Sequence, residues 1–254
     1  MSNDSPAAAE GEPVFAKPAA FELRMALLFS AQFAPNAIAV AYFPLWLKDL
    51  AFSPEQIAFV LAAPLFLRVP ASALISAYAD RARDRVPVLV AVAFGSAALS
   101  AGFFFSTGYG AVLALALLLA LVWGPQTPLV DSLALSGVRR FGSNYNLMRG
   151  TGSVAFLSAN VAGGYIVAAA GPQIVPALLA GGFAVFTVLA LAAPRLGRPR
   201  KQAILPGQAL GEASMLKDKG FVLFVVAGAV IMSSHAHFYT FGSIYWRSSA
   251  SART

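Results

Sequence analysis

The sequence predicts an all-α membrane protein, and three observations support this fold class. Hydrophobic residues make up 58% of the 254 residues and charged residues only 11%, whereas about 25% of an ordinary soluble domain is charged. Several runs of about 20 residues carry no charge, and this is the length that a helix needs to cross a bilayer. The runs are apolar throughout and do not alternate with polar residues as barrel strands do, so each predicted span is a helix.

Along the chain, one polar segment precedes seven apolar ones. Residues 1–20 contain prolines, alanines and acidic residues and are predicted to be a disordered cytosolic tail rather than a signal peptide. The predicted spans are 26–46, 57–79, 86–106, 111–135, 150–170, 173–193 and 220–246. The first six form one helical unit, 21–193. A basic cytosolic linker, 194–219, separates this unit from a seventh transmembrane helix, 220–247, and residues 248–254 are expected to be an unstructured tail.

The positions of the basic residues predict the orientation of the chain. With the N-terminus inside, the segments that face the cytosol hold fourteen of the 18 Lys and Arg residues, and the opposite side holds only Lys48, Arg247 and Arg253. Cytosolic loops carry such an excess of positive charge. We therefore expect a multi-pass protein of the inner (plasma) membrane, with the lipid bilayer as its surroundings and a cytosolic N-terminus. Because the basic residues are spread over alternate loops, they do not form a nucleic-acid-binding stripe.

Two charged residues within the predicted spans are candidates for function. Arg68 falls near the middle of the second segment, where a charge costs at least about 2.5–3.5 kcal/mol. It is interpreted either as an anion-binding residue in a translocation path or as half of a structural ion pair. Asp131 lies toward the inner end of the fourth segment. It pairs with a basic residue, caps the backbone of a broken helix or carries a proton, and the sequence does not decide whether it pairs with Arg68.

Further candidates are polar residues in otherwise apolar segments. His235 and His237 lie two residues apart, which on a helix places them on different faces and disfavours a shared metal ion. His235 is interpreted as a proton relay or as a neutral, hydrogen-bonded residue. The predicted residues of the substrate and proton pathway are Arg68, Asp131, His235, Gln126 and Asn36.

Enzyme chemistry is not expected. The chain has no cysteine, so thiolate metal sites and cysteine nucleophiles are excluded. The short motifs of serine hydrolases, zinc proteases and nucleotide-binding enzymes are missing as well. We therefore predict no catalytic residue, no metal and no cofactor.

The loop after the second segment resembles the signature of the major facilitator superfamily, with Asp80, Arg81 and Arg85 at matching positions. Further matches are similar to the phenylpropionate permease (3-phenylpropionic acid transporter) branch of that superfamily, in the same order and spacing. They are Phe43–Leu47, Ser53–Ile57, Arg68, Pro125, Pro128, Leu129, Asp131, Tyr145, Arg149, Gly152–Phe156, His235, Ala236, Tyr239 and Phe241–Trp246.

The resemblance implies a major-facilitator-type N-terminal six-helix bundle plus one helix of the second half. It implies proton-coupled symport of small carboxylates, aromatic ones included, by alternating access. Arg68 would attract the substrate anion, and Asp131 or His235 would exchange the proton. The residues of the cytosolic gate would be Asp80, Arg81, Arg85 and Arg149.

Members of this family have twelve helices, so we expect a form truncated after the seventh, by a frameshift or an incomplete gene prediction. Such a chain is expected to be completed by a second copy or by a missing C-terminal half, because one half cannot close a cavity built between two. The alternative is a multi-pass membrane protein that does not transport and acts as a receptor, a scaffold or an inactive fragment.

Overall fold

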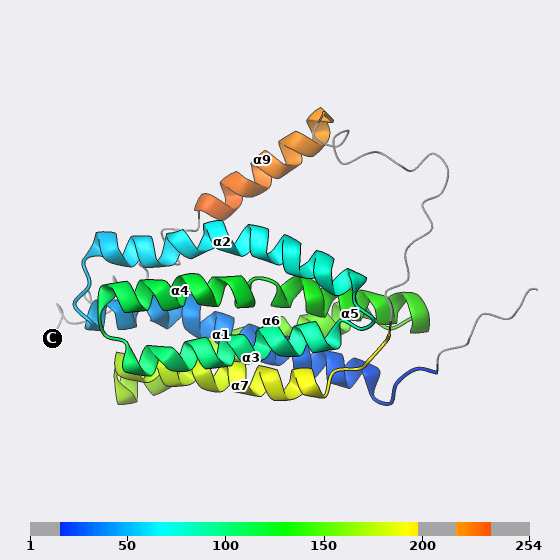
Figure 1. Cartoon of the computed structure of the whole chain (residues 1–254), viewed down its shortest axis with the longest axis horizontal. Helices are drawn as coiled ribbons and strands as arrows, with labels where there is room; N and C mark the ends of the chain where they lie inside the picture. Colours follow the sequence, from blue (N-terminus) through cyan, green and yellow to red (C-terminus); the bar gives the residue numbers. More distant parts are fainter. Residues whose placement is uncertain (1–15, 198–216, 235–254) are drawn as a thin grey trace, which may run out of the picture.

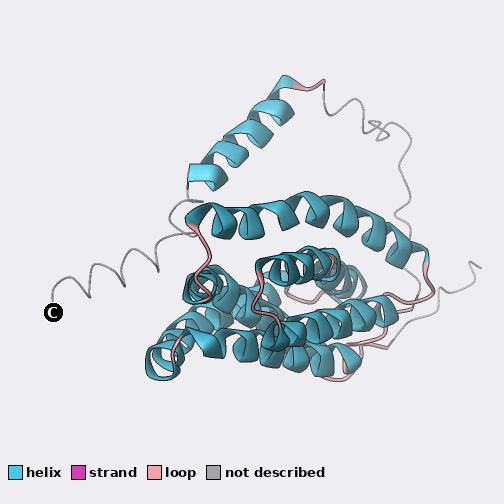
Figure 2. Cartoon of the chain, turned by 60° about the vertical axis from the view of Figure 1, so that its left-hand side comes forward, coloured by secondary structure: helices cyan, strands magenta, loops and turns pink. Residues whose placement is uncertain are grey.

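The computed structural model describes residues 16–197 and 217–234, and every regular element in these ranges is helical (Figures 1 and 2). The helices are α1 (Phe21–Asp49), α2 (Pro54–Arg81), α3 (Val86–Gly102), α4 (Tyr109–Trp123), α5 (Gln126–Phe141), α6 (Tyr145–Ala170), α7 (Val175–Leu191) and α9 (Lys219–Ser234). Two short 3-10 turns follow α3 and precede α7, at Phe103–Phe105 and Pro172–Ile174. The predicted all-α fold is confirmed.

Six helical stretches of the described chain are long and apolar enough to cross a membrane. They correspond to the first six predicted segments. The fourth extends furthest beyond its predicted end, because α4 and α5 together form a span from Tyr109 to Phe141, whereas the sequence predicted 111–135. Arg139 and Arg140 therefore lie on the last turn of α5 and not in a loop. A search for apolar runs stops at the first charge, but a helix continues as long as its backbone hydrogen bonds are made.

Local signals fix several helix ends. Ser53 caps α2 by accepting a hydrogen bond from the backbone N–H of Gln56, whose side chain accepts from the N–H of Ser53; this reciprocal pair is a capping box. The side chain of Asn144 caps α6 in the same way, by accepting from Leu147 N–H. Gly142 ends α5 with φ +65°, a conformation that glycine adopts without a steric penalty.

Helix α1 is the centre of the bundle and packs against α6 and α7, while α3 packs against α7 and α4, and α2 against α4. Close approach of α1 and α6 depends on small residues of α6. A Cβ atom on Gly163 would come within 2.5 Å of Ile38 Cδ1 and 2.9 Å of Tyr42 Cε2. Tyr42 also donates a 2.6 Å hydrogen bond to the carbonyl oxygen of Asn160. Small residues at such contacts let helix backbones pack closely in membranes.

The apolar core consists of two clusters at the two ends of the bundle. One includes Phe21, Phe29 and Leu133. It lies at the end where α1 and α6 begin and α2 ends, which we call the α2–α3 end (right in Figure 1). The other cluster includes Trp46 and Phe103 at the opposite end. Between the clusters, α1, α3 and α5 contribute buried polar residues, among them Gln32, Ser96 and Gln126. A polar layer therefore crosses the middle of the bundle.

The chain continues from α7 along the bundle. Ala193 and Leu196 are buried in the core, so the first described residues of the predicted linker pack against the helices. Arg24 Nε donates a 2.8 Å hydrogen bond to the carbonyl oxygen of Ala192, and Arg140 donates to that of Leu196. Arginines of α1 and α5 thus satisfy carbonyl groups just beyond the end of α7, where intrahelical donors are lacking.

Helix α9 occupies part of the seventh predicted segment and lies beyond α2, apart from the bundle (Figures 1 and 2). It has 16 residues and is largely apolar, although it begins with Lys219 and ends with Ser233 and Ser234. The rest of that segment, including His235 and His237, lies outside the described residues, as do the predicted tails. The prediction that 220–247 spans the membrane stays a prediction.

We predict that Gly163→Ala destabilises the α1–α6 contact by about 1–3 kcal/mol, the usual cost of overpacking. Gly150→Ala is the matched control on the same helix, because a Cβ atom there meets nothing within 4 Å. Thermal unfolding of the purified chain in detergent measures both changes. Equal unfolding temperatures for the two variants would contradict the packing described for Gly163.

Candidate functional site

The fourth span is broken at Gly124 and Pro125, in the middle of the bundle. α4 ends at Trp123 and α5 begins at Gln126. Pro125 and Pro128 have no backbone N–H, so they leave two carbonyl groups without their helical donors. Such breaks are tolerated in a membrane only where the freed backbone is buried in protein or lines a cavity.

Arg68 of α2 lies against this break. A Cβ atom on Gly124 would lie 2.6 Å from Arg68 Cγ, 2.8 Å from Ser72 Oγ and 3.0 Å from the Arg68 carbonyl oxygen. Glycine at position 124 therefore lets α2 approach the start of α5. The guanidinium carbon of Arg68 is 5.8 Å from the centre of the Trp123 ring, which is within the range of a cation–π contact.

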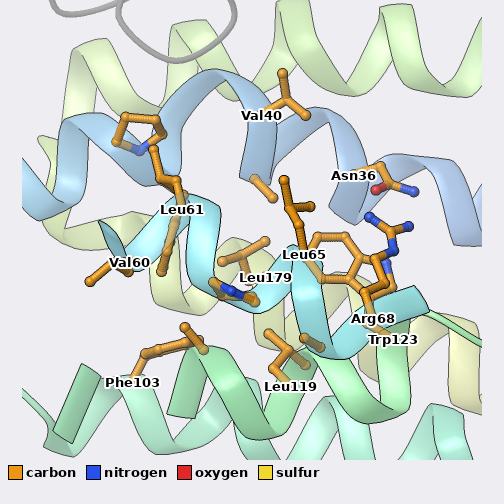
Figure 3. Close-up of a pocket in the computed structure, with 16 residues that line it drawn as sticks. Asn36, Val40, Val60, Leu61, Leu65, Arg68, Phe103, Leu119, Trp123 and Leu179 are labelled. Atoms are coloured by element: carbon orange, nitrogen blue, oxygen red, sulfur yellow. The ribbon is translucent and has the colours of Figure 1, made fainter. Parts of the chain in front are cut away.

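A pocket of about 240 Å³ opens beside Arg68. Its walls come from α1, α2, α4, α7 and the 3-10 turn after α3, and Figure 3 shows the Arg68 side chain next to Asn36 and Trp123 at one end of it. The remaining lining is apolar and includes Phe43, Phe103 and Leu179. Among the described residues, Arg68 forms no ion pair and no hydrogen bond.

Two fully buried glutamines hold the start of α5 in place. Gln32 Nε2 donates a 2.6 Å hydrogen bond to Thr127 Oγ1, and Gln126 Nε2 donates one of 2.7 Å to Ser96 Oγ. Their carbonyl oxygens have no hydrogen-bond partner in the described chain, and neither has the buried N–H of the Trp123 indole. Unpaired buried polar atoms are rare in folded proteins, so these three atoms set the layer beside the break apart from the apolar clusters.

Asp131 lies five residues further along α5 and faces α6. The hydroxyl of Tyr145 donates a 3.0 Å hydrogen bond to Asp131 Oδ1, and Arg149 Nε lies 3.9 Å from the same oxygen. The guanidinium carbon of Arg149 is 4.0 Å from the centre of the Phe33 ring and 5.6 Å from that of Phe29. This second cluster thus joins α1, α5 and α6.

A third polar contact ties the loop between α2 and α3 to α5. Arg85 Nη2 and Nε donate hydrogen bonds of 2.7 and 2.9 Å to Asp80 Oδ1. Arg85 Nη1 donates a 3.1 Å bond to Ser136 Oγ. The side chain of Arg85 is buried, whereas Arg81 is exposed.

The structure brings together residues that the sequence had assigned to different groups. Asp131, predicted for the substrate and proton pathway, pairs with Arg149, which the sequence had placed in the gate, and not with Arg68. Asn36 and Arg68, both predicted for the pathway, share one pocket. Gln126 lies in the polar layer and faces α3. Asp80 and Arg85 are in direct contact. His235 lies outside the described residues.

Sequence reasoning missed several participants in these contacts, among them Trp123, Tyr145 as the partner of Asp131, and Ser136. Trp123 directly precedes the Gly-Pro pair, and an aromatic residue next to a helix break within an apolar segment is a signal that could have pointed to the pocket. A serine or tyrosine has no comparable signal, because its role depends on which residue of another helix lies opposite.

We predict that Gly124→Ala lowers the free energy of unfolding by about 1–3 kcal/mol, because the added methyl group meets backbone as well as side-chain atoms of α2. Gly110→Ala on α4 is the matched control, since a Cβ atom there has no neighbour within 4 Å. Chemical unfolding in detergent, followed by tryptophan fluorescence, compares the two. A Gly124→Ala protein as stable as the control would exclude the close contact of α2 with the break.

Six membrane spans, a broken helix at mid-depth and an interior cation beside a pocket are features of a membrane transporter. The chain belongs to the MFS_1 like family, whose model matches residues 22–254. It is thus a member of the major facilitator superfamily, as its motifs predicted. Proteins of this family are transporters and not enzymes, which confirms the prediction that the chain is no enzyme.

One similar protein is the "Probable 3-phenylpropionic acid transporter" of Escherichia coli, which is 26% identical over 226 residues. The match covers 88% of this chain and 59% of that protein. The chain therefore spans somewhat more than half the length of the relative it matches.

Two crystal structures of the nucleoside transporter NupG have the same fold, at 17% identity each. The mutant form superposes with a TM-score of 0.72 over 87% of this chain and 57% of NupG. The other form gives 0.67 over 89% and 57%. At this identity the similarity establishes the fold alone.

Proposed function

We propose that this chain binds small carboxylates, aromatic acids included, at the Arg68 pocket and belongs to a transporter that moves them together with protons. The observation that carries this proposal is the position of Arg68 and its lack of an anionic partner. It lies in the middle of a span, beside an apolar pocket, and has no anionic partner in the described chain. A guanidinium group in such a position is costly unless an anion or water reaches it.

The shape and lining of the pocket favour an acid with an aromatic or aliphatic body. A volume of about 240 Å³ accommodates a benzene ring with a short side chain. Phe43, Phe103 and Leu179 would surround the apolar part, and Arg68 would bind the carboxylate at the other end, beside Asn36. The printed name of the E. coli relative, a 3-phenylpropionic acid transporter, points to the same chemical class.

Asp131 is the proposed proton carrier. It lies between a hydroxyl donor and a cation, Tyr145 and Arg149, and a carboxyl group in this position can exchange a proton as its surroundings change. His235 is the second candidate from the sequence. Intramembrane carboxylates and histidines commonly serve as proton relays in transporters.

The distribution of basic residues supports a plasma-membrane protein with a cytosolic N-terminus. In this orientation the α2–α3 end faces the cytosol, and Asp80, Arg81 and Arg85 form the proposed gate there. The pocket is lined by helices of one bundle, and a second copy or another six-helix half would supply the opposite wall.

We predict that Arg68→Gln weakens the binding of labelled 3-phenylpropionate by about tenfold or more, because a charge-assisted hydrogen bond is lost. Arg83→Gln, an exposed arginine in the loop after α2, should bind as the wild type does. Equilibrium binding to the purified full chain in detergent measures both. Equal affinity of the Arg68→Gln variant and the wild type would refute the assignment of the pocket.

Uptake into lipid vesicles tests transport separately from binding. Vesicles that contain the chain are given labelled 3-phenylpropionate and an inward proton gradient, with and without a protonophore. Uptake that the protonophore abolishes supports proton-coupled transport. Binding without uptake would instead favour the alternative function, a membrane protein that binds carboxylates but does not move them.

A further inference from the structure

Three helices line the pocket with the same spacing of residues. The lining stretches are 36–43 of α1, 61–68 of α2 and 116–123 of α4, and in each of them the first, fourth, fifth and eighth residues face the pocket. This spacing places the four residues on one face of a helix. The first and eighth residues of such a stretch are about 10.5 Å apart along the helix axis. The pocket is therefore elongated and extends over about two helical turns.

The two ends of the pocket differ in polarity. Arg68, Asn36 and Trp123 lie at one end, and Figure 3 shows Phe103 and Val60 at the other. Phe103 and Val60 are only 2% and 1% exposed. The pocket thus has a cation at one end and is closed by buried apolar side chains at the other. We call the part around Phe103 and Val60 the closed end.

Two further rings hold Phe103 in place at the closed end. The ring centre of Phe103 lies 5.3 Å from that of Phe43 and 5.6 Å from that of Trp46, both in edge-to-face geometry. The rings of Phe43 and Trp46 are themselves 5.3 Å apart. Aromatic pairs at these distances attract each other beyond the effect of burial. Because each ring contacts the other two, Phe103 cannot turn aside for a ligand without the loss of two such contacts.

A short turn directs Phe103, and not its neighbours, into the pocket. Phe103–Phe105 is the 3-10 turn that follows α3, and a 3-10 helix has three residues per turn, so its successive side chains point in different directions. Phe103 is buried, whereas Phe104 and Phe105 are 51% and 90% exposed. The turn therefore supplies one phenylalanine to the closed end and offers Phe105 as a control of the same residue type.

We propose that Phe103 determines the length of the acid that the pocket accepts. This inference rests on the proposed function of the pocket. Arg68 holds the carboxylate at one end, so the body of the ligand extends toward the closed end, where the ring of Phe103 stops it. A longer acid has to give up the contact with Arg68 or displace the three rings. The preferred ligands are aromatic acids in which a short methylene chain joins the ring to the carboxylate.

Two acids of different length test this proposal. 3-Phenylpropionate has two methylene groups between its ring and its carboxylate, and 6-phenylhexanoate has five. Burial of each methylene group favours binding, so a pocket without a closed end binds the longer acid more tightly. We expect the wild-type chain to bind the shorter acid more tightly. Equilibrium dialysis of the purified full chain in detergent, corrected for ligand in the micelles, gives both dissociation constants.

Phe103→Ala removes the ring at the closed end. It should shift the ratio of the two dissociation constants by about tenfold or more toward the longer acid, which is the effect of one methylene group in an apolar pocket. Phe105→Ala, in the same turn but exposed, is the matched control and should keep the wild-type ratio. Phe103→Leu should shift the ratio in the same direction by less, and it serves as the test variant if the alanine variant does not fold. Circular dichroism verifies folding.

Two outcomes would overturn the inference: tighter binding of the longer acid by the wild type, or a wild-type ratio in the folded Phe103 variant. Arg68→Gln separates this failure from a failure of the proposed function. If Arg68→Gln weakens binding of both acids while the Phe103 variant keeps the ratio, the carboxylate site stands and the length limit fails. If Arg68→Gln binds both acids as the wild type does while the Phe103 variant shifts the ratio, the length limit stands and the assignment of the carboxylate to Arg68 fails.

Discussion

The break in the fourth span is the constraint on which the rest of this structure depends. In a bilayer every backbone polar group must be satisfied within the protein, and Pro125 and Pro128 remove two donors at mid-depth. The surrounding helices supply polar partners for the first turn of α5. Gln32 of α1 donates to Thr127, and Ser96 of α3 accepts from Gln126. Gly124 lets α2 pack against the break. The polar layer between the two apolar clusters is the consequence.

This layer also explains how charges are accommodated in the interior. Arg68 lies near the middle of the span and lines a pocket that adjoins the break at Trp123. Asp131 lies in the part of the span beyond the break, where α5 faces α6 and meets Arg149. Arg68, Asp131 and Arg149 together carry one excess positive charge. An interior with this balance attracts anions and repels cations, which agrees with the carboxylate chemistry proposed for the pocket.

The six spans could be predicted from the sequence. A run of apolar residues long enough to cross a bilayer has few stable structures other than a transmembrane helix. The partners of the interior charges could not be predicted in this way. That Asp131 meets Tyr145 and Arg149 depends on the rotation of α5 against α6, and a hydropathy pattern does not contain this angle. The extension of the fourth span to Phe141 was also missed, since Arg139 and Arg140 resemble loop residues when only charge is considered.

The least buried side chains near the pocket show which side of it is open. Leu65 of α2 and Val40 of α1 both line the pocket, and they are 55% and 37% exposed. Both are apolar, so the opening is bordered by groups that water solvates poorly and that lipid or another helix covers well. Arg68 lies deeper, where its charge is shielded by Trp123 and Asn36. Under the proposed function, a carboxylate would pass this apolar border before it meets the cation, and this order would favour anions with an apolar body over small, strongly hydrated ones.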